Sequence, residues 1–413
     1  MYAGQKIQIY PNKTMQKQLQ DWFHYARFCY NKALDLRNQR YKDGLSTSYY
    51  DINNAMKVDK PLWQDSTKRY SSNVFDKAVK NMDQAWKNYF NYFNKLKLAK
   101  EGKGKYPGNK VGKPRFKSRR LHSTQCTIYR KNDYSIKITS RISKTGKKSS
   151  WLHVVNGFYD IKMAEPLAQS GKIKEVTLSR RASKWFASFS IELEDGWELP
   201  FKLDPSTVVG IDANKMHFDI SRTDDKYKNS TVSQPVKKLE VLYRKIQHYD
   251  KLISRKRNQS TYNFRAPSNK YNAVRIKRQR AFYKIQCIQD DFLHKFTTDI
   301  CEHYSTIGIE TLDSSNMAKT KIGKKIYRSL FYRFRMQLTY KSKIYGNNLV
   351  KASKWFPSTQ LCSECGYRRV KEEKLDTTQR VYHCPQCGAI INRDYNAALN
   401  LEMYAAGDIT HDW

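Results

Sequence analysis

Two closely spaced cysteine pairs near the C-terminus form the clearest set of potential metal ligands in this sequence. Each pair has the form Cys-X-X-Cys, and 18 residues separate the pairs: Cys362, Cys365, Cys384 and Cys387. A glycine, Gly366 or Gly388, follows each pair directly. Two thiolates from each turn can complete a tetrahedral S₄ site, and this spacing is typical of a zinc ribbon. We predict a structural Zn²⁺ site, because four protein ligands leave no open position for catalysis; a redox-active pair is the alternative.

Three carboxylates occupy positions from which they could act on a phosphodiester. Asp212 and Glu310 each end an apolar stretch that predicts a strand, and Asp394 opens a short helix after the second cysteine pair. Two Mg²⁺ ions about 3.5–4 Å apart, held by hard oxygen ligands, can activate water and stabilise the leaving oxygen. We predict that these three acids are catalytic and bind two Mg²⁺ ions. A single acid at a strand end is more often a turn residue, so the prediction depends on all three together.

The charge balance predicts a nucleic-acid partner. Among 413 residues, 77 are Lys or Arg and 38 are Asp or Glu, which gives a formal net charge of +39. Nucleic acid is the ordinary partner of such a chain, because each neutralised phosphate releases counterions. An anionic membrane surface is the rival, but we find neither a basic amphipathic helix nor a lipidation signal. No apolar run reaches the roughly 18 residues of a membrane span, and the first residues do not resemble a signal peptide. We therefore expect a cytoplasmic, nucleoid-associated protein.

Two segments hold much of the positive charge. Residues 95–120 contain 11 Lys or Arg and one acid, and residues 236–280 contain 14 Lys or Arg and two acids. Both are expected to lie on a nucleic-acid backbone, with a solvated surface as the alternative. Arg393, beside the third acid, would contact the scissile phosphate or form a structural ion pair. The predicted nucleic-acid contacts are Lys113, Arg115, Lys117, Arg119, Arg120, Arg255, Lys256, Arg257, Arg275, Lys277, Arg278, Arg280 and Arg393.

Hydrophobic periodicity indicates the elements that must position these residues. Alternation and apolar runs predict strands at 5–11, 173–181, 185–193, 207–211, 217–221, 306–310 and 348–355. Helical spacing predicts helices at about 12–40, 70–100, 239–253, 271–304 and 328–345, with a short one after the cysteines. The prolines between Leu199 and Ser206 indicate a domain boundary.

Taken together, the motifs resemble those of the TnpB family, the transposon-associated RNA-guided nucleases from which compact type V CRISPR effectors derive. The resemblance runs from about residue 5 to 402, and its most specific parts are Trp355–Cys362 and Asn392–Ala398. The other matching segments are Ile7–Pro11, Arg27–Leu34, Gly112–Ser118, Val209–Asp212, Asp291–Lys295 and Ile307–Glu310. The family usually has a small apolar residue and Gly where Ala213 and Asn214 stand, and often Asp where Asn392 stands. Neither difference removes a metal ligand, but the turn after Asp212 is expected to differ.

The resemblance implies a multidomain fold with four parts. A split oligonucleotide-binding-type β-barrel, the wedge, would comprise residues 1–12 and 113–203, and a helical recognition domain at 13–112 would be inserted into it. An α/β RNase H-like RuvC domain would comprise 204–355 and 389–408, with a zinc ribbon inserted at 356–388. Periodicity alone gives the order of helical, β, α/β and cysteine-rich parts, whereas closure of the barrel follows only from the resemblance.

The resemblance also implies an RNA-guided DNA endonuclease. A structured guide RNA would bind the basic surfaces, the protein would read a short motif beside the target in double-stranded DNA, and the three acids would cut the opened DNA with Mg²⁺. Three alternatives stay open: a CRISPR effector with the same chemistry, a nuclease-inactive RNA-guided repressor, and a DNA transposase. The intact acids argue against the repressor, and the ribbon between the second and third acids argues against the transposase. The sequence is compatible with a monomer or a dimer.

Overall fold

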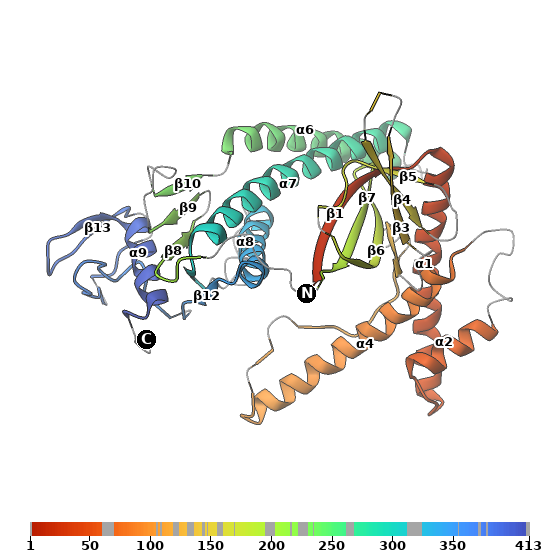
Figure 1. The fold of residues 1–413 in the computed structure, drawn as a ribbon, viewed down its shortest axis with the longest axis horizontal. Helices are drawn as coiled ribbons and strands as arrows, with labels where there is room; N and C mark the ends of the chain where they lie inside the picture. The colour runs from red at the N-terminus through yellow and green to blue at the C-terminus, as the bar shows by residue number, and fades with distance from the viewer. Residues whose placement is uncertain are drawn as a thin grey trace. The chain divides into compact units, whose positions relative to one another are not determined.

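The computed structural model divides the chain into two compact units, residues 1–197 and 198–413, each with its own core (Figure 1). No helix among the described residues is long and apolar enough to cross a membrane. The structure describes residues 2–59, 70–104, 106–107, 110–118, 124–129, 136–142, 145–146, 148–154, 160–168, 170–194, 203–214, 217–221, 230–233, 235–261, 268–311, 324–353, 355–370, 373–376 and 379–409.

A seven-stranded antiparallel sheet forms the frame of the first unit. Its strand order is β2-β6-β7-β1-β5-β4-β3. The strands are β1 (Tyr2–Tyr10), β2 (Gln125–Tyr129), β3 (Ile136–Ile142), β4 (Lys148–Val154), β5 (Ile161–Met163), β6 (Lys172–Arg181) and β7 (Lys184–Glu192). Strand β1 pairs with β7 along most of its length, which unites the two ends of the unit. Because β2 and β3 lie at the two ends of this order, the described strands form a half-barrel sheet. Closure of the barrel, which the resemblance implies, stays a prediction.

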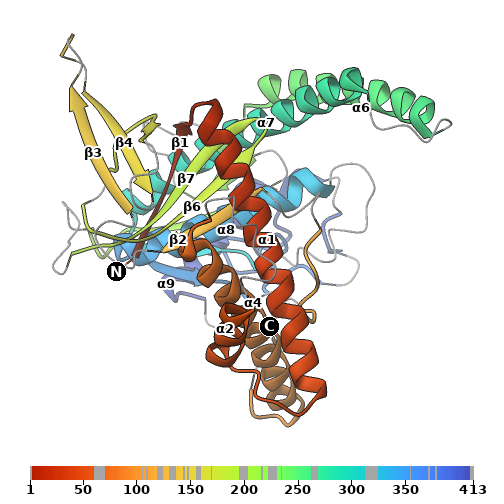
Figure 2. The ribbon, with the colours of Figure 1, turned by 90° about the vertical axis from the view of Figure 1, so that its right-hand side faces the viewer.

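Three helices complete the first unit: α1 (Lys13–Lys42), α2 (Tyr49–Val58) and α4 (Ser72–Lys100). The side chain of Asn12 caps α1 by accepting a hydrogen bond from the backbone N–H of Met15 at 2.9 Å. The buried face of α1, which includes Trp22 and Phe23, shares one core with Ile7 and Ile9 of the sheet. Helices α2 and α4 lie beside α1 (Figure 2). The sequence predicted α1 and α4 but not the short helix α2.

A five-stranded mixed sheet organises the second unit, in the order β10-β9-β8-β11-β12. Its strands are β8 (Val208–Ala213), β9 (His217–Ile220), β10 (Thr231–Ser233), β11 (Thr306–Ile309) and β12 (Asn348–Lys351). Strands β8, β11 and β12 are parallel, whereas β9 and β10 run antiparallel to their neighbours. Ile211 lies opposite Ile309, so the chain reaches Asp212 and Glu310 at the same edge of the sheet.

Helices cover both faces of this sheet. Helices α7 (Asn269–His303) and α8 (Lys324–Tyr345) pack on one face, where the ring of Phe218 lies 5.1 Å from Phe296 and 4.5 Å from Phe334. Helix α9 (Arg393–Ala406) lies on the other face, against β8 and β11. Helix α6 (Val236–Thr261) runs beside α7 and shares with it a small separate core (Figure 1). The hairpin of β13 (Val381–His383) and β14 (Ile390–Asn392) belongs to the cysteine-rich segment before α9.

Candidate active site and cysteine cluster

The three predicted catalytic acids come from three different elements and meet at one edge of the mixed sheet. Asp212 lies in β8, Glu310 directly follows the parallel strand β11, and Asp394 lies in the first turn of α9. Asp212 and Asp394 are each only 6% exposed. The negative charges of Glu310 and Asp394 both act on Asp212, so the three carboxylates lie within electrostatic reach of one another.

Two glycines allow α9 to lie directly on the sheet and thereby place Asp394. A Cβ atom at Gly210 would lie 2.0 Å from the carbonyl oxygen of Ala398, and one at Gly308 would lie 2.3 Å from that of Leu401. Only a residue without a side chain permits so close an approach of helix and strand backbones. The N-terminus of α9 is capped by Asn392, whose side chain accepts hydrogen bonds from the N–H groups of Asp394 and Tyr395. Asn392, where the family often has Asp, therefore acts as the N-cap of α9.

Burial and mutual repulsion disfavour ionisation at this edge. The pKa of Asp212 is raised well above its ordinary value, first by burial and then by the charges of Glu310, Asp394 and Asp219. Burial also raises the pKa of Glu310, against a hydrogen bond donated by the Ser358 hydroxyl that acts to lower it. Carboxylates that repel one another in a buried position match the hard oxygen ligands that a divalent cation such as Mg²⁺ requires. The donor set therefore fits Mg²⁺.

Four polar residues at this edge escaped the sequence analysis. Asp219 lies directly opposite Asp212 across the β8–β9 pair, and His217 lies on the same face of β9. The Asn214 amide donates to Asp212 at 2.7 Å and to Asp219 at 2.9 Å, so the unusual turn after the first acid connects two carboxylates. Ser358, the fourth, orients Glu310. The alternation at 217–221 was visible in the sequence, but the register that brings Asp219 to Asp212 was not.

Two arginines form ion pairs with Asp394, the third acid. The guanidinium of Arg393 donates to Asp394 at 2.9 Å and to the carbonyl oxygen of Gln379 at 2.8 Å. Arg380 lies 3.5 Å from the other oxygen of the same carboxylate, and its side chain is largely exposed. Arg393 thus forms the structural ion pair, one of the two roles that its sequence position allowed. Its contact with a phosphate stays a prediction.

The four cysteines of the predicted zinc site converge. Their sulfur atoms all lie within 4.8 Å of one another. Cys362 and Cys387 are 3.8 Å apart, and Cys365 and Cys384 are 3.5 Å apart, measured between Sγ atoms. Zn–S bonds of about 2.3 Å in a tetrahedron place sulfur atoms about 3.8 Å apart, so the cluster fits Zn²⁺. Gly366 and Gly388 adopt φ values of +74° and +73°, which the turn after each pair requires.

Buried amide side chains connect the cysteine-rich segment to the acids. Asn396 of α9 donates to the carbonyl oxygen of Leu361 at 2.6 Å and accepts from the N–H of Ser363 at 3.0 Å. Asn400 donates to the carbonyl oxygens of Ser358 and Leu361, both at 2.8 Å. Both asparagines are fully buried. The first cysteine turn is therefore fixed on α9, and the same segment carries the Ser358 hydroxyl that donates to Glu310.

The predicted nucleic-acid contacts occupy contrasting environments. Arg115, Arg275, Lys277 and Arg280 are exposed, as are Lys113 and Arg255. Lys117 instead lies 3.6 Å above the Tyr30 ring, and burial lowers its pKa. Arg278 pairs with Asp250 across the α6–α7 hairpin, and Lys256 is half-buried. Arg119, Arg120 and the side chain of Arg257 lie outside the described residues.

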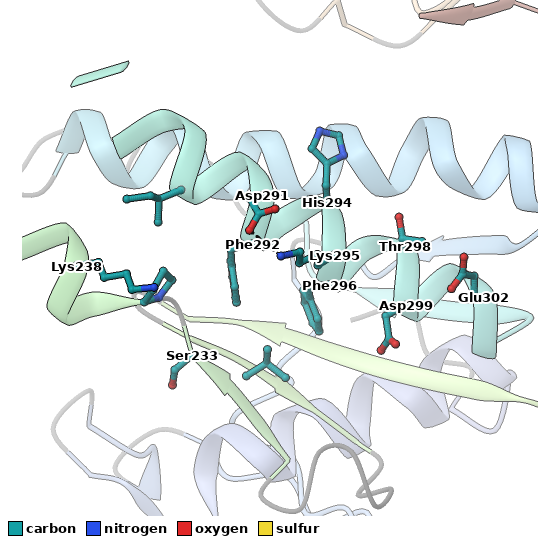
Figure 3. A pocket seen from close by; sticks show the side chains of 13 residues that line it. Ser233, Lys238, Asp291, Phe292, His294, Lys295, Phe296, Thr298, Asp299 and Glu302 are labelled. Carbon is teal, nitrogen blue, oxygen red and sulfur yellow. Dashed lines mark hydrogen bonds and ion pairs between the residues drawn. The ribbon is translucent and has the colours of Figure 1, made fainter. Parts of the chain in front are cut away.

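A separate hollow of about 910 Å³ lies between β10 and α7, on the face of the sheet opposite α9 (Figure 3). Phe292 and Phe296 line it together with Lys238, Asp291, Lys295 and Asp299. Two of its acids already have partners, because Asp291 pairs with Lys295 at 3.0 Å and Asp299 lies 3.9 Å from His303. This hollow is therefore not the place where the three predicted catalytic acids gather.

Comparison with known proteins gives three family models that match successive parts of the chain. They are described as "Helix-turn-helix domain" (HTH_OrfB_IS605, residues 1–46), "Probable transposase" (OrfB_IS605, residues 188–321) and "Cas12f1-like, TNB domain" (residues 331–401). A relative named TnpB-like protein L79, from Acanthamoeba polyphaga mimivirus, is 21% identical and covers 97% of this chain and 72% of its own length. The chain is thus similar to TnpB-like proteins along nearly its whole length. This confirms the resemblance seen in the motifs.

Other relatives also match over nearly the whole chain. A relative from Streptomyces pristinaespiralis, provisionally named an RNA-guided DNA endonuclease, is 28% identical over 403 residues. The match covers 96% of this chain and 87% of the relative. Among solved structures, the Cas12f1–sgRNA–target DNA complex is 12% identical with a TM-score of 0.48, and it covers 97% of this chain and 98% of that one.

Proposed function

We propose that this TnpB-like chain is an RNA-guided DNA endonuclease that cuts DNA at Asp212, Glu310 and Asp394. One observation carries the proposal: three acids, about 100 and 180 positions apart in sequence, converge at one edge of the mixed sheet, where Asp212 and Asp394 are buried. The name of the Streptomyces pristinaespiralis relative supports the same activity. The family model described as a transposase leaves DNA transposition as the second candidate.

Asp212, Glu310 and Asp394 would hold two Mg²⁺ ions, which supply an activated water and stabilise the leaving oxygen of the phosphodiester. Ser358 would hold the Glu310 carboxylate in place through its hydroxyl group. Arg393 and Arg380 would orient Asp394. Hydrolysis would leave a 3′-hydroxyl and a 5′-phosphate, as the RuvC resemblance implies.

The finer domain assignment belongs to the same proposal. Residues 1–12 and 113–203 would form the wedge, 13–112 the recognition domain, 204–355 and 389–408 the RuvC-like domain, and 356–388 the zinc ribbon. The four-cysteine cluster supports a structural Zn²⁺ ion in the ribbon. Guide RNA and double-stranded target DNA would bind the exposed basic residues, above all those of the 95–120 segment and the α6–α7 hairpin.

The test begins with sequencing the RNA that co-purifies with the full-length protein. The protein–RNA complex is then given Mg²⁺ and a plasmid library that carries the guide-matched target beside randomised flanks. We expect one discrete RNA and cleavage at a single flanking motif, and we expect Asp212→Ala to abolish cleavage while RNA and DNA binding persist. Specific binding without any cut would favour the repressor, and absence of a discrete RNA would favour the transposase. Full cleavage by Asp212→Ala would overturn the assignment of the acids.

A further inference from the structure

Strand β9, which lies between β10 and β8, places two further side chains of metal-ligand type beside the three acids. His217 and Asp219 are two residues apart, so both project from the same face of the strand, toward α9. Phe218 and Ile220, which alternate with them, lie in the core with α7 and α8. The cross-strand pair of Asp219 with Asp212 places this second set directly beside the first acid.

The distances suit a single divalent ion. The Nε2 atom of His217 lies 3.1 Å from Oδ2 of Asp219 and 3.8 Å from Oδ2 of Asp394. The three ligand atoms all lie within 4.8 Å of one another. Adjacent donors in an octahedral shell with bonds of about 2.1 Å are about 3.0 Å apart, and opposite donors about 4.2 Å. One ion could therefore contact all three side chains after only small movements.

The surroundings of Asp219 provide an independent reason for a cation at this point. Asp219 is only 3% exposed. Within the described part of the chain its contacts are the Asn214 amide, the Thr231 hydroxyl at 2.6 Å and the His217 imidazole, and no Lys or Arg pairs with it. Buried carboxylates are ordinarily paired with a cation or coordinate a metal. The His217 side chain is 30% exposed, which leaves this position open to an ion from solvent.

We propose that His217, Asp219 and Asp394 hold a divalent transition ion, with Mn²⁺ bound in preference to Mg²⁺, as a nitrogen-containing extension of the three-acid centre. The inference rests on the proposed function, because Asp394 belongs to both sets. Carboxylates accept Mg²⁺ and Mn²⁺ alike, whereas an imidazole ligand suits transition metals and not Mg²⁺. A nitrogen donor beside the carboxylate oxygens therefore shifts the preference of the site away from Mg²⁺ and toward transition ions, for which Mn²⁺ is the probe.

The experiment uses full-length, tag-free protein, stripped of loosely bound divalent ions, with MnCl₂ as the probe. Titration followed by EPR gives the affinity, and pulsed EPR detects a nitrogen nucleus bound to the Mn²⁺ ion. We expect a nitrogen coupling in the wild type that disappears in His217→Gln. Mn²⁺ binding by that variant should weaken by at least the roughly 10–100-fold that loss of an outer-shell partner of a metal ligand costs, while Mg²⁺ binding changes less. The matched control is His303→Gln, an exposed histidine on α7 that should leave both measurements unchanged.

The outcomes separate this inference from the proposed function. If wild-type protein binds Mn²⁺ without a nitrogen coupling, and Asp212→Asn abolishes that binding, His217 only forms an ion pair with Asp219. The inference then falls, and the three-acid centre stands. If Asp212→Asn retains both Mn²⁺ binding and cleavage, the proposed function falls. The nitrogen coupling is measured on the wild type, so misfolding of a variant cannot obscure the result.

Discussion

The buried position of Asp212 suits its proposed role as a metal ligand but lowers the stability of the metal-free protein. Its carboxyl group is buried among other carboxylates, and its folded-state pKa is raised above the value of about 3.9 found in unfolded chains. At a pH below its unfolded-state pKa, such a group costs no stability. As the pH rises from there through its folded-state pKa, the group increasingly destabilises the metal-free protein. Under the proposed function, a bound cation would reverse that sign, because the ionised carboxylate would then be a metal ligand.

We therefore predict that Asp212→Asn stabilises the metal-free protein and abolishes cleavage. In EDTA near pH 7.5 the melting temperature should rise, by ~2–4 °C for each kcal/mol gained. The gain should shrink as the pH is lowered toward 4, where the wild-type carboxyl group is protonated. The control is Asp204→Asn, because hydrogen bonds from Ser206 lower the pKa of Asp204 and its loss should destabilise the protein. A lower melting temperature for Asp212→Asn would contradict the repulsion that we describe.

Residue type and local context were sufficient to select Asp212, Glu310, Asp394 and the four cysteines from the sequence. The spacing within a cysteine pair is a local feature that indicates metal chemistry by itself, whereas an acid at the end of an apolar strand does so only together with the other two acids. Asp219 could not be found in this way, because its relevance depends on its pairing opposite Asp212. Cross-strand register is fixed by tertiary packing and has no signature in a short strand.

At the scale of elements, the site depends on how closely α9 lies on β8 and β11. The N-terminus of α9 carries Asp394, and its middle touches the sheet at Gly210 and Gly308. The sequence predicted a short helix and two strands, but it gave no sign that these glycines form the contact between them. It also missed α2, a helix of ten residues in which only Ile52, Asn53 and Met56 are buried. Short elements carry too few periods for their pattern to be read.

We predict that Gly210→Ala displaces α9 and disables the site. The added methyl group would overlap the backbone of α9, at a cost of about 1–3 kcal/mol, the usual range for overpacked sites. A shift of about 1 Å at Asp394 would lower the cleavage rate on the order of 100-fold. Thermal melting and single-turnover cleavage measure the two effects. Gly4→Ala in β1 is the control, since its nearest contact would be an ordinary 3.9 Å; equal behaviour of the two variants would refute the close packing of α9.

At the scale of the whole molecule, the net charge of +39 indicates a polyanionic partner but does not say which cations meet it. The structure distinguishes exposed from paired arginines within the α6–α7 hairpin. Arg275 and Arg280 are exposed. Arg278 is held against Asp250, with its guanidinium 4.7 Å from the centre of the Phe282 ring. The sequence treated all three alike, because charge counts carry no information about which side of a helix faces a neighbour.

This distinction predicts different salt dependences of RNA binding. Each phosphate contact contributes about 0.7–0.9 to the slope of log K against log salt concentration. If Arg275 and Arg280 both contact the guide RNA, the double variant Arg275→Gln/Arg280→Gln should lose about twice that slope and keep its melting temperature. Arg278→Gln removes one charge that is already paired with Asp250, so it should leave the slope almost unchanged and slightly lower the melting temperature. Affinities for the co-purified RNA across a KCl series decide between the two kinds of arginine. A loss of slope in Arg278→Gln alone would mean that the Arg278–Asp250 pair opens to bind RNA and that Arg275 and Arg280 are merely solvated.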